Sequence, residues 1–280
     1  MLLGVHVSIE GKIYEALDKA HALGCNAMQI FSRNPRQWRQ LKLSQEDIEE
    51  FKRRRKLYGI KAVVVHTPYL INLASPYKIL YRKSIKAYVE DLNEAHQLGA
   101  EFLVTHMGSH SKTTEEAGID RFASALNTIF EKTEQIRVKL LLENTAGAGS
   151  WLGYNFRHHQ MIFKRVKYKE RLGICLDTAH AFAAGFDLRT KQGLNILIEQ
   201  IEQLVGLSNL EVIHLNDSRK DFSSRLDQHE HLGRGKLGMA AIRQIVKHPK
   251  LKNKVFILET PHKELQDDAK NLAVVRNILN

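Results

Sequence analysis

Short runs of aliphatic and β-branched residues recur along the chain and alternate with longer amphipathic stretches. Each run is typical of a strand buried in a parallel sheet. The eight runs span residues 2–7, 27–31, 62–66, 102–106, 139–143, 173–177, 211–214 and 255–259. The stretches between them carry helix signals, such as the capping-box pattern Ser44-Gln-Glu-Asp47. Glycine follows three of these stretches, in Leu23-Gly24, Tyr58-Gly59 and Leu98-Gly99, where its left-handed conformation can end a helix. The pattern therefore predicts a repeated strand–helix unit.

Eight such units without a linker rich in proline, glycine or serine predict one α/β domain. We expect a single (β/α)8 TIM barrel that spans residues 1–280, because eight is the number of strands that closes such a barrel. The two longest irregular segments are residues 144–154, rich in glycine, and residues 217–238, rich in charged residues and histidine. Long loops between barrel elements are usually functional.

Composition narrows the class of protein. The hydrophobic share of 43% is ordinary for a globular fold and excludes a largely disordered or fibrous chain. No apolar run approaches the ~18 residues of a membrane span, and residues 1–12 lack the pattern of a signal peptide. Cys25 and Cys175 form neither a disulfide framework nor a zinc-type pair. We therefore expect a cytoplasmic protein with no membrane partner, associated with the nucleoid if the cell is prokaryotic.

The net charge is +11, from 42 Lys and Arg against 31 Asp and Glu. A basic surface favours nucleic acid, because binding to phosphates releases counterions, although many basic proteins bind none. The charge is thus a weak indication of a nucleic-acid partner.

The strongest signal is the residue type that ends successive strands. From the third strand to the eighth, these residues are His66, His106, Glu143, Asp177, His214 and Glu259. The carboxyl ends of barrel strands open into one mouth, where active sites of this fold are built. One such residue alone is usually an ordinary core histidine or a solvated strand end. Six together would be costly to bury unless cations neutralise them, so the set predicts a metal site.

Two loop patterns add possible ligands. Asp177-Thr-Ala-His180 offers a further imidazole one helical turn beyond a strand end, and Asp227-Gln-His229 places two ligand types on the same side of an extended chain. Imidazole and carboxylate without thiolate suit zinc, manganese or iron, and clustered ions of this kind suit phosphoester cleavage. Gly147-Ala-Gly149 lacks the Gly-Lys-Ser/Thr ending of a P-loop, and we interpret it as a flexible barrel loop.

These residues resemble the endonuclease IV family of apurinic/apyrimidinic (AP) endonucleases over nearly the whole chain, from Gly4-Val-His-Val-Ser8 to Leu258-Glu-Thr260. The shared motifs are Asn34-Pro-Arg-Gln-Trp38, Tyr69-Leu-Ile-Asn-Leu73, Glu143-Asn-Thr-Ala-Gly147, Asp177-Thr-Ala-His-Ala-Phe-Ala-Ala-Gly185, His214-Leu-Asn-Asp217 and Asp227-Gln-His229. The resemblance implies a zinc-dependent hydrolase of DNA base-excision repair. Such an enzyme cleaves the phosphodiester bond 5′ to an abasic site and leaves a 3′-hydroxyl and a 5′-deoxyribose phosphate. A 3′-repair phosphodiesterase activity is also expected.

The resemblance also implies a role for particular residues. It assigns one zinc to His66, His106 and Glu143, a second to Glu143, Asp177, His214 and Glu259, and a third to His180, Asp227 and His229. Glu143 would be the bridging, catalytic carboxylate, and Mn²⁺ could replace Zn²⁺ at one or more of the three sites. Arg36, Tyr69 and Leu70 would insert into DNA at the abasic gap. The chain departs from many relatives at Met107, where they have proline, and His110 would support the site from behind.

Two other functions are compatible with such a barrel. A sugar isomerase or epimerase could use Glu143, Asp177, His214 and Glu259 around a single metal, but it would not need the five further ligand-type residues. A DNA-binding module without catalysis would need none of them. We expect the partner to be double-stranded DNA with abasic sites or blocked 3′ ends, bound by a monomer.

Overall fold

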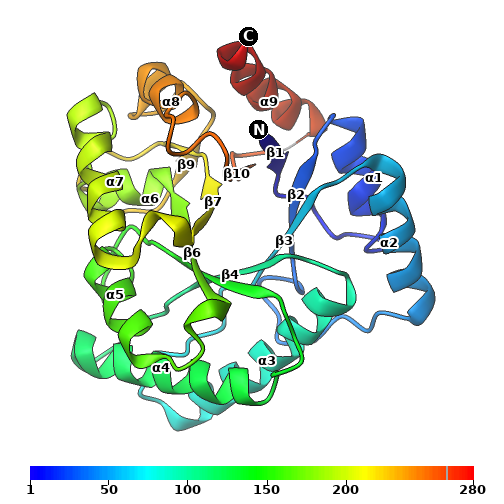
Figure 1. Cartoon of the computed structure of the whole chain (residues 1–280), viewed down its shortest axis with the longest axis vertical. Coiled ribbons are helices and arrows are strands. Elements are labelled where there is room, and N and C mark those ends of the chain that lie inside the picture. The colour runs from blue at the N-terminus through cyan, green and yellow to red at the C-terminus, as the bar shows by residue number, and fades with distance from the viewer. Residues whose placement is uncertain (263) are drawn as a thin grey trace.

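The computed structural model of the chain describes residues 1–262 and 264–280. Within these residues, eight parallel strands form one sheet that curves into a barrel (Figure 1). These strands are β1 (Leu2–Val5), β2 (Ala27–Phe31), β3 (Ala62–His66), β4 (Phe102–His106), β5 (Lys139–Glu143), β6 (Leu172–Asp177), β7 (Leu210–His214) and β10 (Val255–Leu258). The expected barrel is confirmed. Its strand bounds differ from the predicted ones by two residues at the end of β1 and by one residue in β6, β7 and β10.

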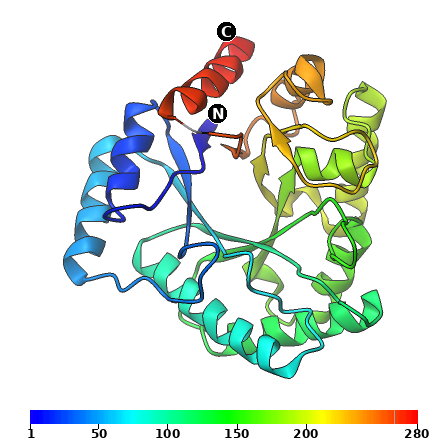
Figure 2. The same ribbon diagram turned by 180° about the vertical axis from the view of Figure 1, so that it is seen from behind.

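Helices surround the barrel, and Figure 2 shows the same ring of helices from the opposite side. They are α1 (Glu15–Ala22), α2 (Gln45–Tyr58), α3 (Lys78–Gln97), α4 (Glu115–Glu131), α5 (Phe156–Arg165), α6 (Thr178–Ala184), α7 (Lys191–Val205), α8 (Gly238–Val246) and α9 (Leu265–Leu279), with short 3-10 helices η1 (Lys169–Arg171) and η2 (Leu207–Asn209). The capping box at Ser44 is confirmed, since its side chain accepts from the Asp47 amide and Asp47 accepts from the Ser44 amide. None of the described helices has the length and apolar character needed to cross a lipid bilayer.

The barrel closes between its first two strands. His6 and Gln29 form an isolated parallel bridge there, and the Val7 amide donates to the Gln29 carbonyl at 2.7 Å. Gly4 makes this approach possible, because a Cβ at this position would lie 1.8 Å from the Ala27 carbonyl oxygen. A side chain at Gly4 would therefore force β1 and β2 apart at this junction, which we call the seam of the barrel.

Two apolar layers hold the strands in place. One lies between the sheet and the helices. The other fills the barrel interior and consists of Ala27, Ala62, Val64, Val104, Leu141, Cys175, Val212, Val255 and Ile257. Cys25 and Cys175 are free, buried thiols, as the sequence predicts. The interior layer is the floor on which the mouth of the barrel is built.

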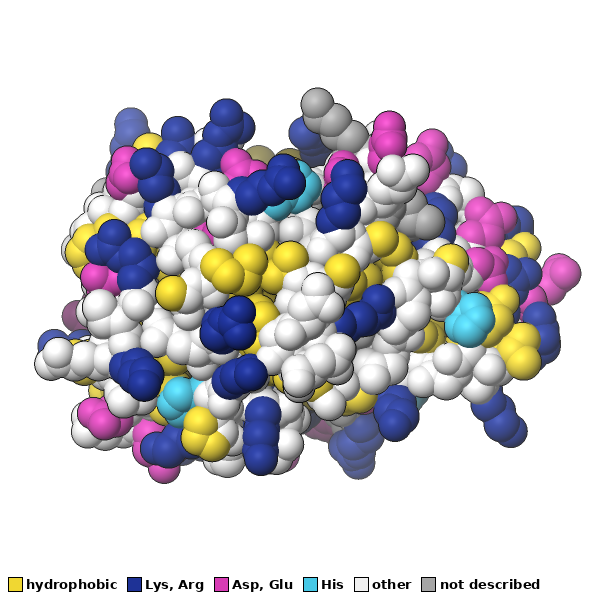
Figure 3. Space-filling view, turned by 90° about the horizontal axis from the view of Figure 1, so that it is seen from above, with side chains coloured by type: hydrophobic (Ala, Val, Ile, Leu, Met, Phe, Trp, Pro, Cys, Tyr) yellow, Lys and Arg dark blue, Asp and Glu magenta, His cyan; other side chains and the backbone are white. Residues whose placement is uncertain are grey.

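The positive charge is spread over the surface. In Figure 3, lysine and arginine side chains are scattered over the visible face, while acidic side chains lie mainly towards its edges. This distribution agrees with the formal charge of +11.

A buried ion pair fixes the loop after β2. The Arg33 side chain is fully buried, and its Nε donates to Asp91 Oδ1 at 2.9 Å while its Nη1 donates to the Trp38 carbonyl at 2.7 Å. Glu94 lies one turn further along α3, is only 3% exposed, and has no hydrogen-bond partner among the described residues. Burial, reinforced by the charge of Asp91, raises the pKa of Glu94 to about 9.

We predict that Glu94→Gln removes a pH-dependent loss of stability. An unfolded chain loses the Glu94 proton near pH 4.5, whereas the folded chain keeps it up to about pH 9. Between these values the unfolded state binds fewer protons, so wild-type stability should fall with rising pH by as much as about 1.4 kcal/mol per unit from this group alone. Glutamine cannot titrate, so the stability of the variant relative to wild type should increase from pH 5 to pH 9.

Urea denaturation at several pH values measures this difference. Glu199→Gln, at an exposed position on α7, is the matched control and should show no such trend. A pH-independent difference between Glu94→Gln and wild type would mean that Glu94 is ionised in the folded protein at neutral pH.

Candidate metal centre

The register of the barrel brings the strand-end residues together. Alternate residues of a strand face the same side, so the residue two positions beyond an interior side chain also points along the barrel axis. Val64, Val104, Leu141, Cys175, Val212 and Ile257 belong to the interior layer. The residues two positions further on are His66, His106, Glu143, Asp177, His214 and Glu259. All six predicted positions therefore converge in one mouth.

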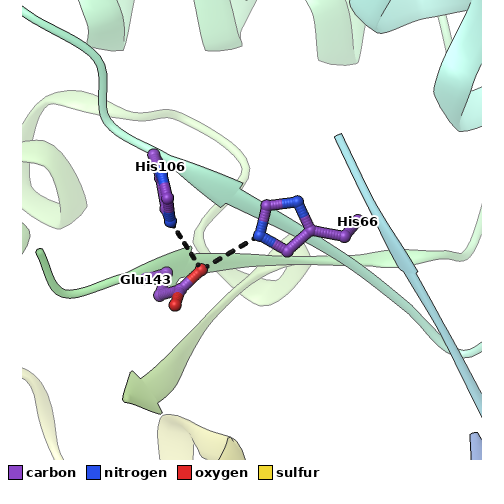
Figure 4. Close-up of side chains that lie close together, drawn as sticks. All are labelled: His66, His106 and Glu143. Atoms are coloured by element: carbon purple, nitrogen blue, oxygen red, sulfur yellow. Dashed lines mark hydrogen bonds and ion pairs between the residues drawn. The ribbon is translucent and has the colours of Figure 1, made fainter. Parts of the chain in front are cut away.

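The first cluster consists of His66, His106 and Glu143 (Figure 4). Both imidazoles present Nε2 to the same carboxylate oxygen, Glu143 Oε2, each at 3.1 Å. His66 Nδ1 lies 2.6 Å from the Thr67 carbonyl, which can only accept, so Nδ1 carries the proton and the Nε2 lone pair of neutral His66 faces the carboxylate. Two lone pairs that meet in this way repel each other unless a proton or a cation lies between them. The donor set and its contacts thus fit a metal ion.

The second cluster shares Glu143 and adds Asp177, His214 and Glu259. His214 Nδ1 lies 3.0 Å from Glu143 Oε1 and 3.2 Å from Glu259 Oε2. Burial is the largest single influence on the pKa of Glu143 and would raise it, but the surrounding imidazoles, including His214, His106 and His180, together hold this pKa well below its usual range. The two oxygens of one ionised carboxylate therefore face two different clusters.

The third cluster includes residues from a loop. His180 Nε2 lies 3.1 Å from Asp227 Oδ2, and His229 Nε2 lies 3.5 Å from both Asp227 Oδ1 and Asp177 Oδ2. His229 Nδ1 points to the Glu259 carbonyl, whereas His180 Nδ1 lies 2.9 Å from the Asn144 carbonyl and 3.4 Å from Glu143 Oε1. The structure thus brings the predicted trio of His180, Asp227 and His229 together, and it adds Asp177, which lies between the second and third clusters.

The loop that carries this trio has an internal support that sequence reasoning missed. Strands β8 (Asp217–Ser218) and β9 (His229–Glu230) form a separate antiparallel pair. The buried carboxylate of Asp217 accepts hydrogen bonds from the amides of Gly233, Gly235 and Leu237 at 2.9 to 3.0 Å. The motif His214-Leu-Asn-Asp217 contained this aspartate, but no local pattern shows that its partners lie some twenty residues ahead.

Two polar residues of the first two strands were also missed: His6 directly follows β1, and Gln29 is the middle residue of β2. His6 Nδ1 lies 3.1 Å from Glu259 Oε1, and the side chain of Gln29 contacts both Glu259 and His214. The available signal was a single glutamine in the otherwise apolar strand Ala27–Phe31. Asn216 was missed as well, and its Nδ2 donates to Asp177 Oδ2 at 2.7 Å.

A cavity of about 270 Å³ opens beside the clusters. Its walls include Tyr69, Trp151, His106, Asp227 and the segment 145–148. Tyr69 is 56% exposed at this rim, and Leu70 beside it is half-buried. Arg36 is exposed on the loop after β2 and forms no side-chain hydrogen bond or ion pair with the described residues. The Arg36 side chain can therefore contact a ligand.

The loop at Met107 is well supported despite the missing proline. Met107 is fully buried, and Asn72 brackets the next turn by accepting from the Ser109 amide and donating to the Ser109 carbonyl. His110 does not contact the clusters through any described interaction, and its Nδ1 bonds to the Thr113 carbonyl. His110 therefore holds the loop before α4.

Comparison with known proteins agrees with this geometry. The family described as Xylose isomerase-like TIM barrel matches residues 17–278. The chain is 41% identical to the "Probable endonuclease 4" of Chloroflexus aurantiacus over 99% of this chain and 97% of that protein. The crystal structure of endonuclease IV from Thermus thermophilus superposes with a TM-score of 0.89 at 37% identity, and the match covers 100% of this chain and 99% of the other.

A D-tagatose 3-epimerase-like protein shares the fold with a TM-score of 0.76 at 22% identity, over 100% of this chain and 97% of its own. That likeness extends to the barrel alone, whereas the likeness to the endonucleases extends to the sequence along nearly the entire chain. The chain therefore belongs to the endonuclease IV family.

Proposed function

We propose that this chain is a metal-dependent AP endonuclease that hydrolyses the phosphodiester bond 5′ to an abasic site. The products are a 3′-hydroxyl and a 5′-deoxyribose phosphate, and the same hydrolysis removes blocking groups from 3′ ends. One observation carries the proposal: the two oxygens of Glu143 face two separate groups of ligand-type side chains. Membership of the endonuclease IV family supports it.

The ligand assignment follows the three clusters. His66, His106 and Glu143 would hold one zinc, Glu143, Asp177, His214 and Glu259 a second, and His180, Asp227 and His229 a third, with Mn²⁺ as a substitute at one or more sites. Ions held by these residues would supply a water activated as a nucleophile and would stabilise charge on the attacking and departing oxygens of a phosphodiester. The imidazole and carboxylate donors, without thiolate, suit these ions.

The chain itself supplies position and shape. Glu143 is buried at the end of β5, so its carboxylate is held in place between the first two clusters. The cavity beside Tyr69 and Trp151 offers room for a sugar displaced from the duplex. Arg36, Tyr69 and Leu70 insert at the abasic gap, where unstacking is cheap because a base is already missing. Lysine and arginine elsewhere contact phosphates.

A sugar isomerase or epimerase remains the second candidate for such a barrel. It would use Glu143, Asp177, His214 and Glu259 around one metal. The additional convergence of His66, His106, His180, Asp227 and His229 favours the nuclease, because a single-metal reaction has no use for these side chains. An enzyme that incises abasic DNA and does not isomerise or epimerise ketoses would be the nuclease and not the sugar enzyme.

We further propose that residues 1–280 act as one catalytic barrel domain, as a monomer on double-stranded DNA. The partner is duplex DNA with abasic sites or blocked 3′ ends, and the compartment is the cytoplasm, at the nucleoid in a prokaryotic cell. The excess of basic side chains supports this assignment, since it favours a polyanionic partner.

We predict that Glu143→Gln abolishes strand incision while the barrel stays folded. Glutamine keeps the shape but removes the charge that two clusters share, and turnover should fall by more than about 100-fold, the upper range for loss of an outer partner of a metal. The assay is incision of a duplex with one abasic site, with circular dichroism as the folding check. Glu211→Gln, which removes a carboxylate paired with Lys139 away from the mouth, should retain activity. Near-normal turnover of Glu143→Gln with full metal content would exclude the shared-carboxylate mechanism.

We predict that Asp227→Ala and His229→Ala each lose about one equivalent of bound metal and most activity, because a site with three protein ligands cannot spare one. Elemental analysis of the purified protein measures the stoichiometry. Asp221→Ala is the matched control, since Asp221 lies on the same loop but is exposed and pairs with Lys236. Unchanged stoichiometry in both variants would identify Asp227-Gln-His229 as a solvated loop segment.

We predict that the triple change of Arg36, Tyr69 and Leu70 to alanine weakens binding to abasic duplex by at least about 10-fold more than binding to undamaged duplex, since an aromatic stacking contact such as that of Tyr69 alone contributes about 1–3 kcal/mol. Bound metal should not change. Fluorescence anisotropy on both DNAs gives the comparison. Lys56→Ala with Leu57→Ala, which alters exposed residues at the end of α2, is the control. Equal losses on both DNAs would show that these are general contacts.

A further inference from the structure

Gln29 is a polar residue in the interior of the barrel that has no role in the assignments above. It is fully buried on β2, between Met28 and Ile30. Its side chain forms two short hydrogen bonds at the mouth: Nε2 lies 2.6 Å from Glu259 Oε1, and Oε1 lies 2.7 Å from His214 Nε2. Gln29 thus contacts two of the side chains of the second cluster.

The chemistry of these partners fixes the orientation of the amide. A carboxylate without a proton can only accept hydrogen bonds, so the amide NH2 of Gln29 must face Glu259. The amide oxygen then faces His214, and it too can only accept. His214 must therefore donate from Nε2, and its proton in the neutral form lies on that nitrogen.

This arrangement directs the other nitrogen of the ring into the cluster. With the proton on Nε2, the lone pair of Nδ1 points at Glu143 Oε1 and Glu259 Oε2, which lie 3.0 and 3.2 Å away. The hydrogen bond from Nε2 of Gln29 also holds one oxygen of Glu259, so that the other oxygen faces His214. One amide therefore orients an imidazole and a carboxylate towards the same space.

The position of Gln29 itself is rigid. Its backbone forms the bridge with His6 at the seam where the barrel closes, and its carbonyl accepts from the Val7 amide at 2.7 Å. His6 Nδ1 lies 2.9 Å from Gln29 Nε2, so the side chain is also bounded on the side of β1. Because the fold already fixes the Gln29 side chain, this side chain can position its partners without a further loss of conformational freedom.

We infer that Gln29 is a positioning residue that sets the tautomer of His214 and the orientation of Glu259 for a divalent cation. The inference rests on the proposed function, which assigns a metal to this cluster. Outer partners of metal-binding histidines fix ring orientation and tautomer, and their loss typically costs about 10- to 100-fold in metal affinity. Gln29 performs this role for two ligands at once.

The first test is the affinity for zinc in competition with a chelating dye. Gln29→Leu removes both hydrogen bonds but keeps similar bulk, and it should weaken the binding of one equivalent by about 10- to 100-fold while the others change little. Thr133→Val is the matched control, because Thr133 is a buried hydrogen-bonding residue between α4 and β5, far from the mouth in the contacts it makes. This control should bind zinc as the wild type does.

The second test needs no variant and stays valid if Gln29→Leu does not fold. Long-range ¹H–¹⁵N NMR of the zinc-loaded wild-type protein should show the proton of His214 on Nε2. A proton on Nδ1, or an unchanged zinc affinity in folded Gln29→Leu, would overturn the inference alone. Wild-type protein that bound no divalent cation would overturn the proposed function together with it.

Discussion

The repulsion between buried carboxylates is the constraint on which the mouth of the barrel depends. Glu143 and Asp177 are almost fully buried, Glu259 lies beside them, and the side chains that contact them directly include imidazoles that present a lone pair. Without compensation, an arrangement of this kind costs several kcal/mol, because each ion loses its water. Protons or divalent cations supply the compensation. The apo protein and the metal-loaded protein should therefore differ in how many protons these residues hold, since metal binding releases protons from its ligands.

The rest of the barrel supports this arrangement through its rigidity. The strand-end residues keep their places because the interior layer beneath them is fully apolar and the strands are locked in a parallel register. The junction between β1 and β2 differs from the other strand pairs of this frame, since among the described residues its pairing is the isolated bridge of His6 with Gln29. Gly4 allows the two backbones to meet, and Gln29 connects the seam directly to Glu259 and His214. The closure of the barrel and the geometry of the site therefore depend on the same residue.

Sequence reasoning predicted those features that depend on local order along the chain. The eight strands, the capping box at Ser44 and the convergence of six strand ends follow from periodicity and from the symmetry of the barrel. It missed Gln29, Asp217 and the second contact of Asp177, because each acts on residues distant in sequence. Periodicity indicates which face of a strand is buried but not which buried polar group meets which other. Glu94 shows the same limit, since nothing in its neighbourhood predicts a carboxyl group without a partner among the described residues.

The three clusters differ in rigidity, because the first two are built on strand ends and the third includes residues of a loop. His66, His106, Glu143 and His214 are the last residues of strands, so their backbones are fixed by the sheet before any ligand arrives. Asp227 lies instead on the loop between β8 and β9, and its side chain is half exposed. Its position depends on the β8–β9 pair and on Asp217, whose carboxylate accepts hydrogen bonds from the backbone amides of Gly233 and Gly235, which follow His229. The geometry of the third cluster thus depends on the order of this loop, whereas the first two clusters are preformed by the barrel.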